Sequence, residues 1–419
     1  MKRILTIAVL LMSVCVLTQA QKMPKRADVL KAMHCANDYF IRKYPDATKP
    51  TFVKKERPSN LWTRGVYFEG LMELIKLDPS NQQNIDYMET WGNFHKWTPR
   101  NGINTRDADD YCCSQAYLDY YAWKNERKIG SNLTAEERQK MTNPSVECME
   151  HLMSLADTKP DPNSKAKFNG SSIHDWTWID AIQMGLPVLT TLERMTSKSN
   201  PGQAKKYSEQ GYRMYVWTRD TLAGGLFNEE EGLWWRDKDF VPPYKEPNGR
   251  NCYWSRGNGW VYAALVRAME DVHPIEGCTW NNHFNDYKAD FIAMSEALLK
   301  CQRKDLFWNC SLHDDSHFGG KELTGTALFI YGMAWGVRNG ILDKGTYQPI
   351  VAKTWKAMVK KCLHKNGFLG FVQGTGKEPK DSQPVGYNNE PDFDDFGLGC
   401  FLLAGSEVYR LSAATEKTR

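Results

Sequence analysis

A loose internal repeat is the feature of this sequence that most limits how the chain can fold. A loop with aromatic or acidic residues repeatedly opens onto a helix that starts with small residues, at positions 62–65, 109–111, 178–180, 256–260, 324–327 and 396–399. The openings recur roughly every 45–80 residues, which is room for two helices and their connections. Small residues at a helix start let backbones approach closely. We therefore predict an all-α fold, a closed α/α toroid with every opening on one rim.

Apolar residues at three- and four-residue intervals support this prediction. Helices are predicted at residues 26–42, 66–75, 113–124, 146–156, 180–197, 207–222, 259–272, 287–301, 325–339, 346–362 and 396–412. Strand alternation is scarce, and short hairpins are expected around 226–237 and 367–373, where glycines punctuate aromatic and aliphatic residues. No linker interrupts the pattern, so we predict a single domain over residues 21–419.

Residues 1–20 have the pattern of a secretory signal peptide. Lys2 and Arg3 form a basic start, residues 4–17 an apolar core, and residues 18–20 an exit with small side chains. The stretch is too short and wrongly flanked for a stable membrane span. We expect an exported protein. Because the pattern of a lipid anchor or a surface-attachment module is missing, the periplasm of a Gram-negative bacterium is the expected compartment.

Charge and composition restrict the classes of partner. The net charge is +4 without a basic block, so neither nucleic acid nor a membrane is expected as a partner. Fifteen Trp and nineteen Tyr favour stacking on sugar rings, although a large aromatic core explains them equally well. The cysteines after the leader are scattered, which favours buried thiols with one or two bridges. No zinc-type spacing is present, and we expect no metal and no cofactor.

Asp180 is the acid that stands out in this pattern. It is the one acid between Asp175 and Leu189, and Trp176 and Trp178 lie beside it. Ionisation is costly in an apolar neighbourhood, so its pKa should rise, which is the property that a general acid needs near neutral pH. Taken alone, such an aspartate is more often a helix cap or a packing residue. The predicted toroid changes this balance, because it places the residue on the rim.

The rim of the predicted toroid gathers residues that are far apart in the sequence. Asp109, Asp180, Arg256, Trp254 and Trp260 would meet around a single pocket. Such a pocket combines carboxyl groups, a guanidinium and aromatic rings.

Four stretches carry a resemblance to a known family. They are WTWIDAIQMGLPVL, YWSRGNGWVYAALVRAM, KELTGTALFIYGMAWG and DDFGLGCFLLAGSEVYRL. They resemble the unsaturated rhamnogalacturonyl hydrolases, glycoside hydrolase family 105, and the related family 88 of unsaturated glucuronyl hydrolases. The likeness extends over nearly the whole chain after the leader, in the expected order. The resemblance implies an (α/α)6 barrel.

The resemblance also implies a reaction. Polysaccharide lyases leave a 4,5-unsaturated uronic acid at the non-reducing end of an oligosaccharide, and the family hydrates that double bond. An acid protonates C4, positive charge develops at C5 and the ring oxygen, and water adds at C5. The hemiketal then opens and expels the remaining sugar. One well-placed proton donor is enough, in contrast to the paired carboxylates of ordinary glycosidases.

By the resemblance, Asp180 is the general acid/base and Trp178 its aromatic neighbour. The second carboxylate falls within 107–110, with Asp109 favoured over Asp110, and would position water or sugar hydroxyls. From its residues alone, Asp109 is explained equally well as a helix N-cap.

The resemblance further implies Arg256 as the partner of the substrate carboxylate, because a guanidinium fork matches a carboxylate with two hydrogen bonds. A structural salt bridge is the alternative. Trp254 and Trp260 are implied as stacking walls, with core packing as the alternative. Arg236 and Asp237 face the same region by the family pattern, and Asp110 is a further binding candidate. The His that some members carry near Arg236 is missing here, which puts the sugar contacts at that point in doubt.

Other residues near the openings are weaker candidates. Glu322 and Thr324 are expected to cap a helix. Trp62 and Arg64 are candidates for the rim.

The expected partner is an oligosaccharide with an unsaturated uronic acid end, and the oligomeric state stays open. Unsaturated galacturonyl-rhamnose from rhamnogalacturonan is the favoured substrate, and glucuronyl ends of other glycans are the alternative. A polysaccharide lyase on the same toroid could use Tyr111 and Arg256. A sugar epimerase would need paired His bases, which the sequence does not place near the openings. A non-catalytic sugar binder would gain nothing from a desolvated acid.

Overall fold

Helices dominate the computed structural model, which describes residues 22–53, 56–126, 133–161, 163–273 and 275–417. The expected signal peptide, residues 1–20, lies outside the described residues. None of the helices that the structure describes is both long and apolar enough to cross a bilayer.

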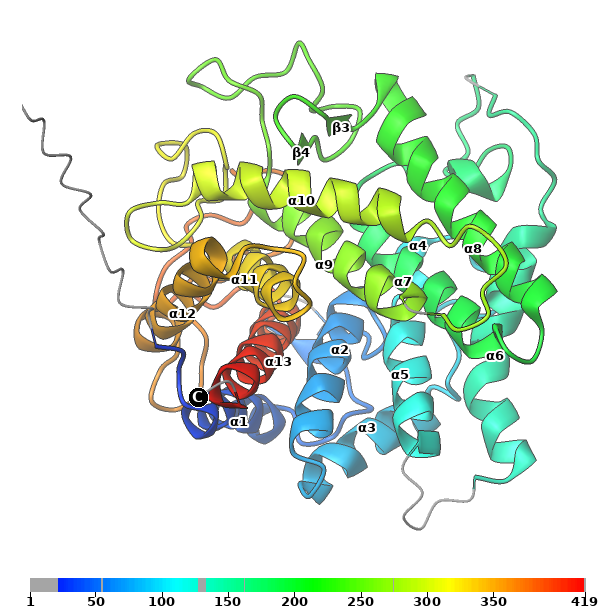
Figure 1. Ribbon diagram of the computed structural model, residues 1–419, viewed down its shortest axis with the longest axis horizontal. Helices are drawn as coiled ribbons and strands as arrows, with labels where there is room; N and C mark the ends of the chain where they lie inside the picture. The colour runs from blue at the N-terminus through cyan, green and yellow to red at the C-terminus, as the bar shows by residue number, and fades with distance from the viewer. Residues whose placement is uncertain (1–21, 54–55, 127–132, 162, 274, 418–419) are drawn as a thin grey trace, which may run out of the picture.

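Six inner helices of the described chain form a closed ring (Figure 1). They are α2 (Trp62–Leu77), α5 (Cys113–Glu126), α7 (Asp180–Thr196), α9 (Ser255–Val272), α11 (Leu323–Arg338) and α13 (Asp395–Lys417). Each packs against the next in this order, and α13 packs against α2, which closes the ring.

An outer layer of helices covers the ring. It consists of α1 (Arg26–Lys43), α3 (Gln82–Phe94), α6 (Ala135–Ser154), α8 (Pro201–Val216), α10 (Phe284–Cys301) and α12 (Lys344–Lys361). The helices from α3 onward each pack on the inner helix that precedes them in the chain, and α1 packs on α13. The first helix thus covers the last, and the fold is the (α/α)6 barrel that was predicted.

The connections contain the remaining short elements. They are the strands β1 (Thr51–Phe52), β2 (Glu56–Arg57), β3 (Phe227–Asn228) and β4 (Leu233–Trp234), the helix α4 (Ala108–Tyr111), and the turns η1 (Ser172–His174), η2 (Trp217–Thr221) and η3 (Leu222–Gly224). The antiparallel pair β3–β4 confirms the hairpin expected within 226–237. The hairpin expected at 367–373 is wrong, since that region has an isolated bridge between Leu363 and Leu369. The pair β1–β2 was not predicted.

Every predicted helix is present, and α3 is an additional one. The pattern of α3 is weak because few of its side chains are buried, among them Tyr87, Met88 and Trp91. The expectation of one or two disulfides is wrong, since the cysteines that the structure describes are all unbridged. Cys112 and Cys113 instead donate from Sγ to the carbonyls of Trp62 and Asn60.

Backbone contact between α2 and α13 closes the ring. A Cβ atom on Gly70 would lie 2.6 Å from the carbonyl oxygen of Gly399, and one on Gly399 would lie 2.3 Å from the carbonyl oxygen of Val66. Both distances are too short for any side chain. Glycine is therefore required at this crossing, because nothing larger lets the helices meet.

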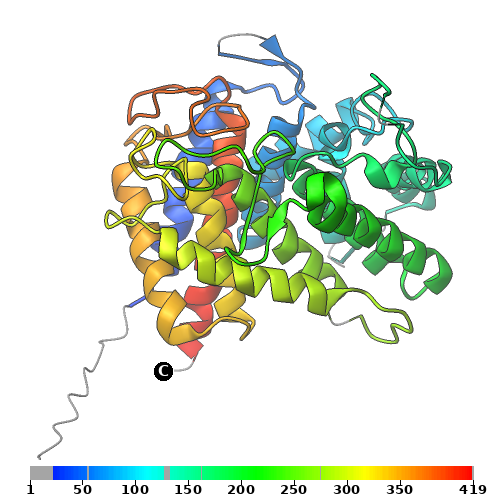
Figure 2. The ribbon, with the colours of Figure 1, turned by 90° about the horizontal axis from the view of Figure 1, so that it is seen from above.

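All inner helices run in the same direction, because each outer helix returns the chain. Figure 2 shows the consequence: the long connecting segments gather at one end of the barrel, away from the C-terminus. This is the end where the inner helices begin. The loop openings predicted from the repeat therefore share one rim.

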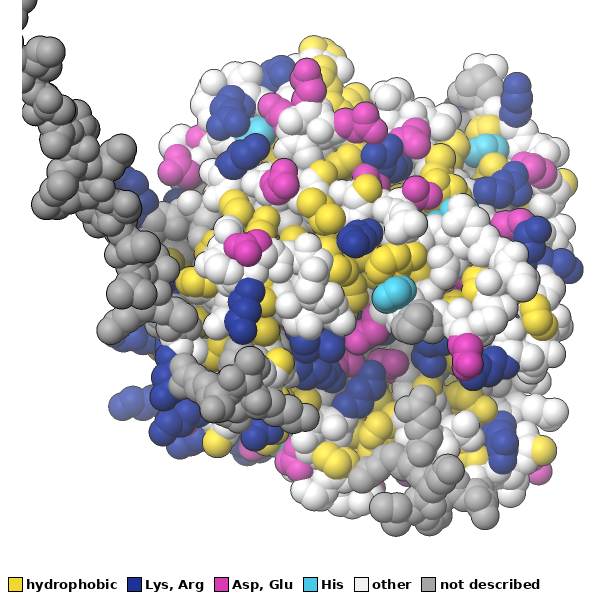
Figure 3. All heavy atoms as spheres, viewed as in Figure 1, with side chains coloured by type: hydrophobic (Ala, Val, Ile, Leu, Met, Phe, Trp, Pro, Cys, Tyr) yellow, Lys and Arg dark blue, Asp and Glu magenta, His cyan; other side chains and the backbone are white. Residues whose placement is uncertain are grey.

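Charged side chains close the other end. Figure 3 shows acidic and basic side chains gathered near the middle of that face. Lys76 donates to Glu73 at 2.7 Å and to Asp119 at 3.0 Å, and Arg410 donates to Glu73 and Glu407. These pairs join α2, α5 and α13.

The close crossing predicts the effect of a single methyl group. Gly399→Ala should lower the free energy of unfolding by about 1–3 kcal/mol, because the added Cβ forces α13 away from α2. Urea denaturation of the purified protein measures this. Gly202→Ala is the matched control, since a Cβ there comes no nearer than 3.7 Å to Asn200 Oδ1. Equal stability of the two variants would contradict the close crossing.

Candidate active site

Asp180 is the first residue of α7, at the rim. The residue is 8% exposed, and Trp176 and Ile179 beside it are fully buried. The Nε atom of Arg236 donates to Asp180 Oδ2 at 3.2 Å. Burial raises the pKa of the Asp180 carboxyl, while the charges of Arg236 and Arg256 oppose that rise. The expected upward direction is confirmed.

Asp109 lies in α4, close enough to Asp180 for the two carboxyl groups to interact electrostatically. Burial raises the pKa of the Asp109 carboxyl to about 7, and the negative charges of Asp107 and Asp180 add to that effect, whereas Lys167 and Arg236 oppose it. The helix cap is made by Asp107, whose Oδ1 accepts from the Asp109 backbone N–H at 3.3 Å. Asp109 is therefore not the N-cap of α4, and its carboxyl is half protonated near neutral pH.

Arg236 and Asp237 reach the site because β4 leads the chain back to α7. An antiparallel bridge joins Trp178 to Asp237, and the Ile179 N–H donates to the Arg236 carbonyl at 3.0 Å. Arg236 Nη1 also donates to Asp237 Oδ2 at 2.7 Å. One guanidinium thus bridges Asp180 and Asp237, and its side chain is still 20% exposed.

The carboxylate of Asp110 accepts hydrogen bonds from the loop before α4. Its carboxylate accepts from Thr105 Oγ1 at 2.6 Å and from Asn101 Nδ2 at 2.9 Å, and Arg100 lies at 3.4 Å. These contacts order the loop and engage Asp110. Asp109 and Asp237 remain as carboxyl groups that interact with Asp180, and Asp237 is already paired with Arg236.

Arg256 does not present a free guanidinium fork. It is fully buried, and its Nη1 and Nη2 atoms donate to the carbonyls of Gln373 and Gly374 at 2.6 and 2.7 Å. The guanidinium lies 4.6 Å from the ring centre of Trp254 and 5.0 Å from that of Phe396. The structural salt bridge, which was the alternative for Arg256, does not hold this side chain either, since its guanidinium donates to carbonyls. Arg256 anchors a loop of the rim.

Trp254 and Trp260 are buried. Trp254 Nε1 donates to Gln373 Oε1 at 2.9 Å, and Trp260 meets Trp62 edge to face with ring centres 6.2 Å apart. Both therefore pack rather than offer an open face. The partly exposed rings at helix starts of the rim are Trp178 and Trp62.

Gln373 is a structural residue of the rim that the sequence did not indicate. Its Nε2 atom donates to the carbonyls of Glu378, Pro379 and Asp381 at 2.9–3.2 Å. Its backbone N–H donates to Glu322, which also caps α11 as expected. A glutamine in a glycine-rich loop carries no pattern that distinguishes it, so no sequence signal could have found this role.

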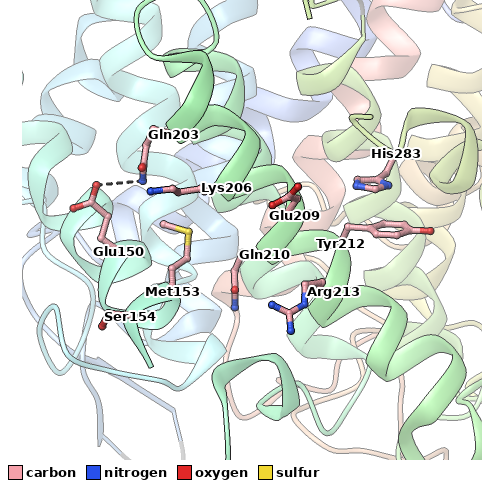
Figure 4. A pocket seen from close by; sticks show the side chains of 10 residues that line it. All are labelled: Glu150, Met153, Ser154, Gln203, Lys206, Glu209, Gln210, Tyr212, Arg213 and His283. Carbon is pink, nitrogen blue, oxygen red and sulfur yellow. Dashed lines mark hydrogen bonds between the residues drawn. The ribbon is translucent and has the colours of Figure 1, made fainter. Parts of the chain in front are cut away.

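Within the described residues, no three His, Cys, Asp or Glu side chains come together in a way that could hold a metal ion. A surface cavity of about 720 Å³ lies between the outer helices α6 and α8, away from the rim acids (Figure 4). Its lining consists of Glu150, Met153, Ser154, Gln203, Lys206, Glu209, Gln210, Tyr212, Arg213 and His283.

The raised pKa of Asp109 predicts how stability depends on pH. An unfolded aspartate loses its proton near pH 3.8 and the folded one near pH 7, so folding stability falls as pH rises between these values. Asp109→Asn removes this loss. The variant should be more stable than the wild type by about 1–3 kcal/mol near pH 8, with the gain reduced by partial exposure of the carboxyl, and should lose the advantage near pH 4.

Urea denaturation at both pH values measures this effect. Asp239→Asn is the control, because Lys238 holds the pKa of that exposed carboxyl below its usual value. A gain at pH 8 in the control, or none in Asp109→Asn, would contradict the assignment.

This chain is similar in sequence and in fold to known proteins. A protein of Formosa agariphila described as an unsaturated 3S-rhamnoglycuronyl hydrolase is 31% identical over 356 residues, and the match covers 84% of each chain. A family 88 glycosyl hydrolase structure from Bacteroides vulgatus aligns with a TM-score of 0.74 at 26% identity, over 93% of this chain and 100% of that one. A structure described as a polysaccharide lyase aligns with a TM-score of 0.73 at 28% identity, over 92% and 97%.

The resemblance noted in the sequence is confirmed. Residues 10–412 match the family described as Glycosyl Hydrolase Family 88. The chain belongs to Glycosyl Hydrolase Family 88.

Proposed function

We propose that this chain is a hydrolase that removes 4,5-unsaturated uronic acid from the non-reducing end of oligosaccharides made by polysaccharide lyases. Membership of family 88 and the described activity of the Formosa agariphila relative support this. The observation that carries it is the pair Asp180 and Asp109. The pKa values of both carboxyl groups are raised, and the charge of Asp180 contributes to the rise at Asp109. Perturbed acids of this kind are what acid–base catalysis near neutral pH requires.

The reaction is a hydration followed by a ring opening. The acid transfers its proton to C4, the C4=C5 bond becomes single, and the positive charge is shared by C5 and the ring oxygen. Water adds at C5 and returns one proton to the carboxylate. The C5–O bond of the hemiketal then breaks to give a ketone at C5. The former ring oxygen forms an aldehyde at C1, and the remaining sugar leaves as an alcohol.

Asp180 is the proton donor in this proposal, and Asp109 positions water or a sugar hydroxyl. Both roles suit their surroundings, because Asp180 is the more deeply enclosed and Asp109 is partly exposed. Trp178 is the aromatic wall, since its ring precedes Asp180 by two residues and is partly exposed. Two acids in different environments can take different roles in one reaction, one as the proton donor and one as the group that positions water.

Arg236 is the cation that a substrate carboxylate meets at this site. Its guanidinium is partly exposed and already bridges two carboxylates, whereas that of Arg256 is enclosed and donates to carbonyls. A substrate carboxylate that draws Arg236 away from Asp180 removes a stabilising positive charge from the aspartate. Loss of a neighbouring cation raises a carboxyl pKa. Substrate binding thereby prepares Asp180 to donate.

Rhamnose is the proposed neighbour of the unsaturated uronic acid. It is part of the expected rhamnogalacturonan-derived substrate, and the described activity of the Formosa agariphila relative also contains a rhamnose. Galacturonyl-rhamnose stays the first choice, and glucuronyl-rhamnose is the alternative. A panel of both, with and without sulfate, decides between them.

A polysaccharide lyase is the second candidate, because one similar structure is described as such. A lyase on this rim would use a Tyr or His as base. Tyr111 is unsuited, since it is fully buried, its hydroxyl accepts from Trp176 Nε1 at 2.8 Å, and burial raises its pKa well above the usual value. The two reactions also have opposite signals, because a lyase creates the absorbing double bond and the hydrolase removes it.

Export to the periplasm is part of the proposal. The basic start and apolar core of residues 1–20 support it. Fractionation of the producing cells tests it, and retention of the full-length chain in the cytoplasm would contradict it.

The activity predicts the effect of one substitution. Asp180→Asn should lower kcat/KM on an unsaturated uronyl-rhamnose disaccharide by at least about 100-fold, because the amide cannot donate the proton. Loss of ultraviolet absorbance by the conjugated double bond measures the rate.

Asp239→Asn is the control at an exposed carboxylate near the same rim, and it should keep wild-type activity. Full activity of Asp180→Asn would refute the assignment of the donor. Unchanged absorbance with wild-type protein and every galacturonyl and glucuronyl substrate would refute the hydrolase.

A further inference from the structure

The segment between α6 and η1, residues 155–171, is held beside the candidate active site by contacts of two cations, Arg106 and Lys167. Arg106 donates to both carboxylate oxygens of Asp175, at 2.9 and 2.6 Å, and to the Gly170 carbonyl at 3.2 Å. Lys167 donates to Asp107 Oδ2. Residues 155–161 and 163–171 form neither helix nor strand, and these contacts hold them beside α4.

Lys167 stands next to the groups that do the chemistry. Its Nζ atom lies 5.9 Å from the ring centre of Trp178 and 5.2 Å from that of Phe168. The carboxylate that it contacts belongs to Asp107, whose other oxygen caps the backbone N–H of Asp109. One ion pair therefore joins the segment 155–171 to the start of α4.

We propose that Lys167 is a positioning residue of the hydration reaction, which acts by neutralising Asp107 and thereby sets the charge and the placement of Asp109. The proposal rests on the proposed function for its catalytic consequence. Its electrostatic part holds for the protein alone. Lys167 does not need to touch the substrate for this role.

The charges that face Asp109 come from every element around it. Asp107 at the start of α4 and Asp180 on α7 are negative, and Arg236 after β4 and Lys167 on the segment 155–171 are positive. Arg236 is already paired with Asp180 and Asp237. Lys167 is therefore the cation that offsets Asp107, and without it the Asp107 carboxylate faces the Asp109 carboxyl without a paired cation.

The direction in which Lys167 shifts the pKa of Asp109 follows from this arrangement. Lys167 lowers the pKa of Asp109, so its removal must move that pKa upward from about 7. The side chain of Lys167 is 62% exposed, and solvent and salt weaken its field. We expect a shift of about half a pH unit. The limb of the pH profile governed by Asp109 moves to higher pH whether the enzyme needs that carboxyl charged or protonated.

The test compares Lys167→Met with Lys167→Arg and with Lys165→Met, an exposed lysine on the same segment. The pH profile of kcat/KM is measured on an unsaturated uronyl-rhamnose disaccharide. Lys167→Met should move the limb near pH 7 upward by about half a unit, and less in 0.5 M salt. Lys167→Arg and Lys165→Met should overlay the wild type. Overlay of all four profiles would overturn the proposal, and so would an equal shift in Lys165→Met.

A second measurement needs no substrate. Between about pH 6 and pH 8, where Asp109 titrates, the pH dependence of urea unfolding should differ between Lys167→Met and the wild type, and this difference should vanish when both carry Asp109→Asn. A difference that persists in the Asp109→Asn background would overturn the proposal. Failure of the hydrolase function alone would abolish turnover but leave this result intact.

Discussion

The contact between the backbones of α2 and α13 is the constraint on which the rest of the structure depends. Gly70 and Gly399 allow the last inner helix to lie directly against the first, which closes the ring. Once the ring is closed, helix starts that are hundreds of residues apart share one rim. Asp109, Asp180 and Arg236 meet on that rim through local contacts, because α4 packs on α7 and an antiparallel bridge joins Trp178 to Asp237.

The two arginines for which the sequence predicted substrate contacts have different surroundings in the structure. Arg256 is enclosed between Trp254 and Phe396 and anchors the loop that starts at Gln373. Arg236 remains at the surface and controls Asp180. Both arginines lie within two residues of a tryptophan in the sequence, and only the hydrogen-bond partners distinguish a guanidinium that supports a loop from one that is available to a ligand.

The repeat, the helices and the desolvated Asp180 could be predicted because each depends on local pattern: small residues at helix starts, apolar spacing, and an acid among aromatic residues. The burial of Trp254 and Trp260 could not be predicted, since the sequence around a tryptophan does not show whether its ring packs in the core or stacks on a sugar. Lys167 lies in a segment without periodicity, and its importance depends on a fold that brings it to Asp107.

The polar interior below the rim has a consequence for the shape of the substrate. Glu69 is fully buried, its carboxyl accepts from Gln183 Nε2 at 2.9 Å, and the ion pairs around Glu73 and Arg410 seal the far end. Packed side chains therefore fill the described part of the barrel below the rim, and they leave no tunnel from one end to the other. A polymer cannot thread through a filled barrel, so this architecture suits trimming of chain ends better than cuts within the chain.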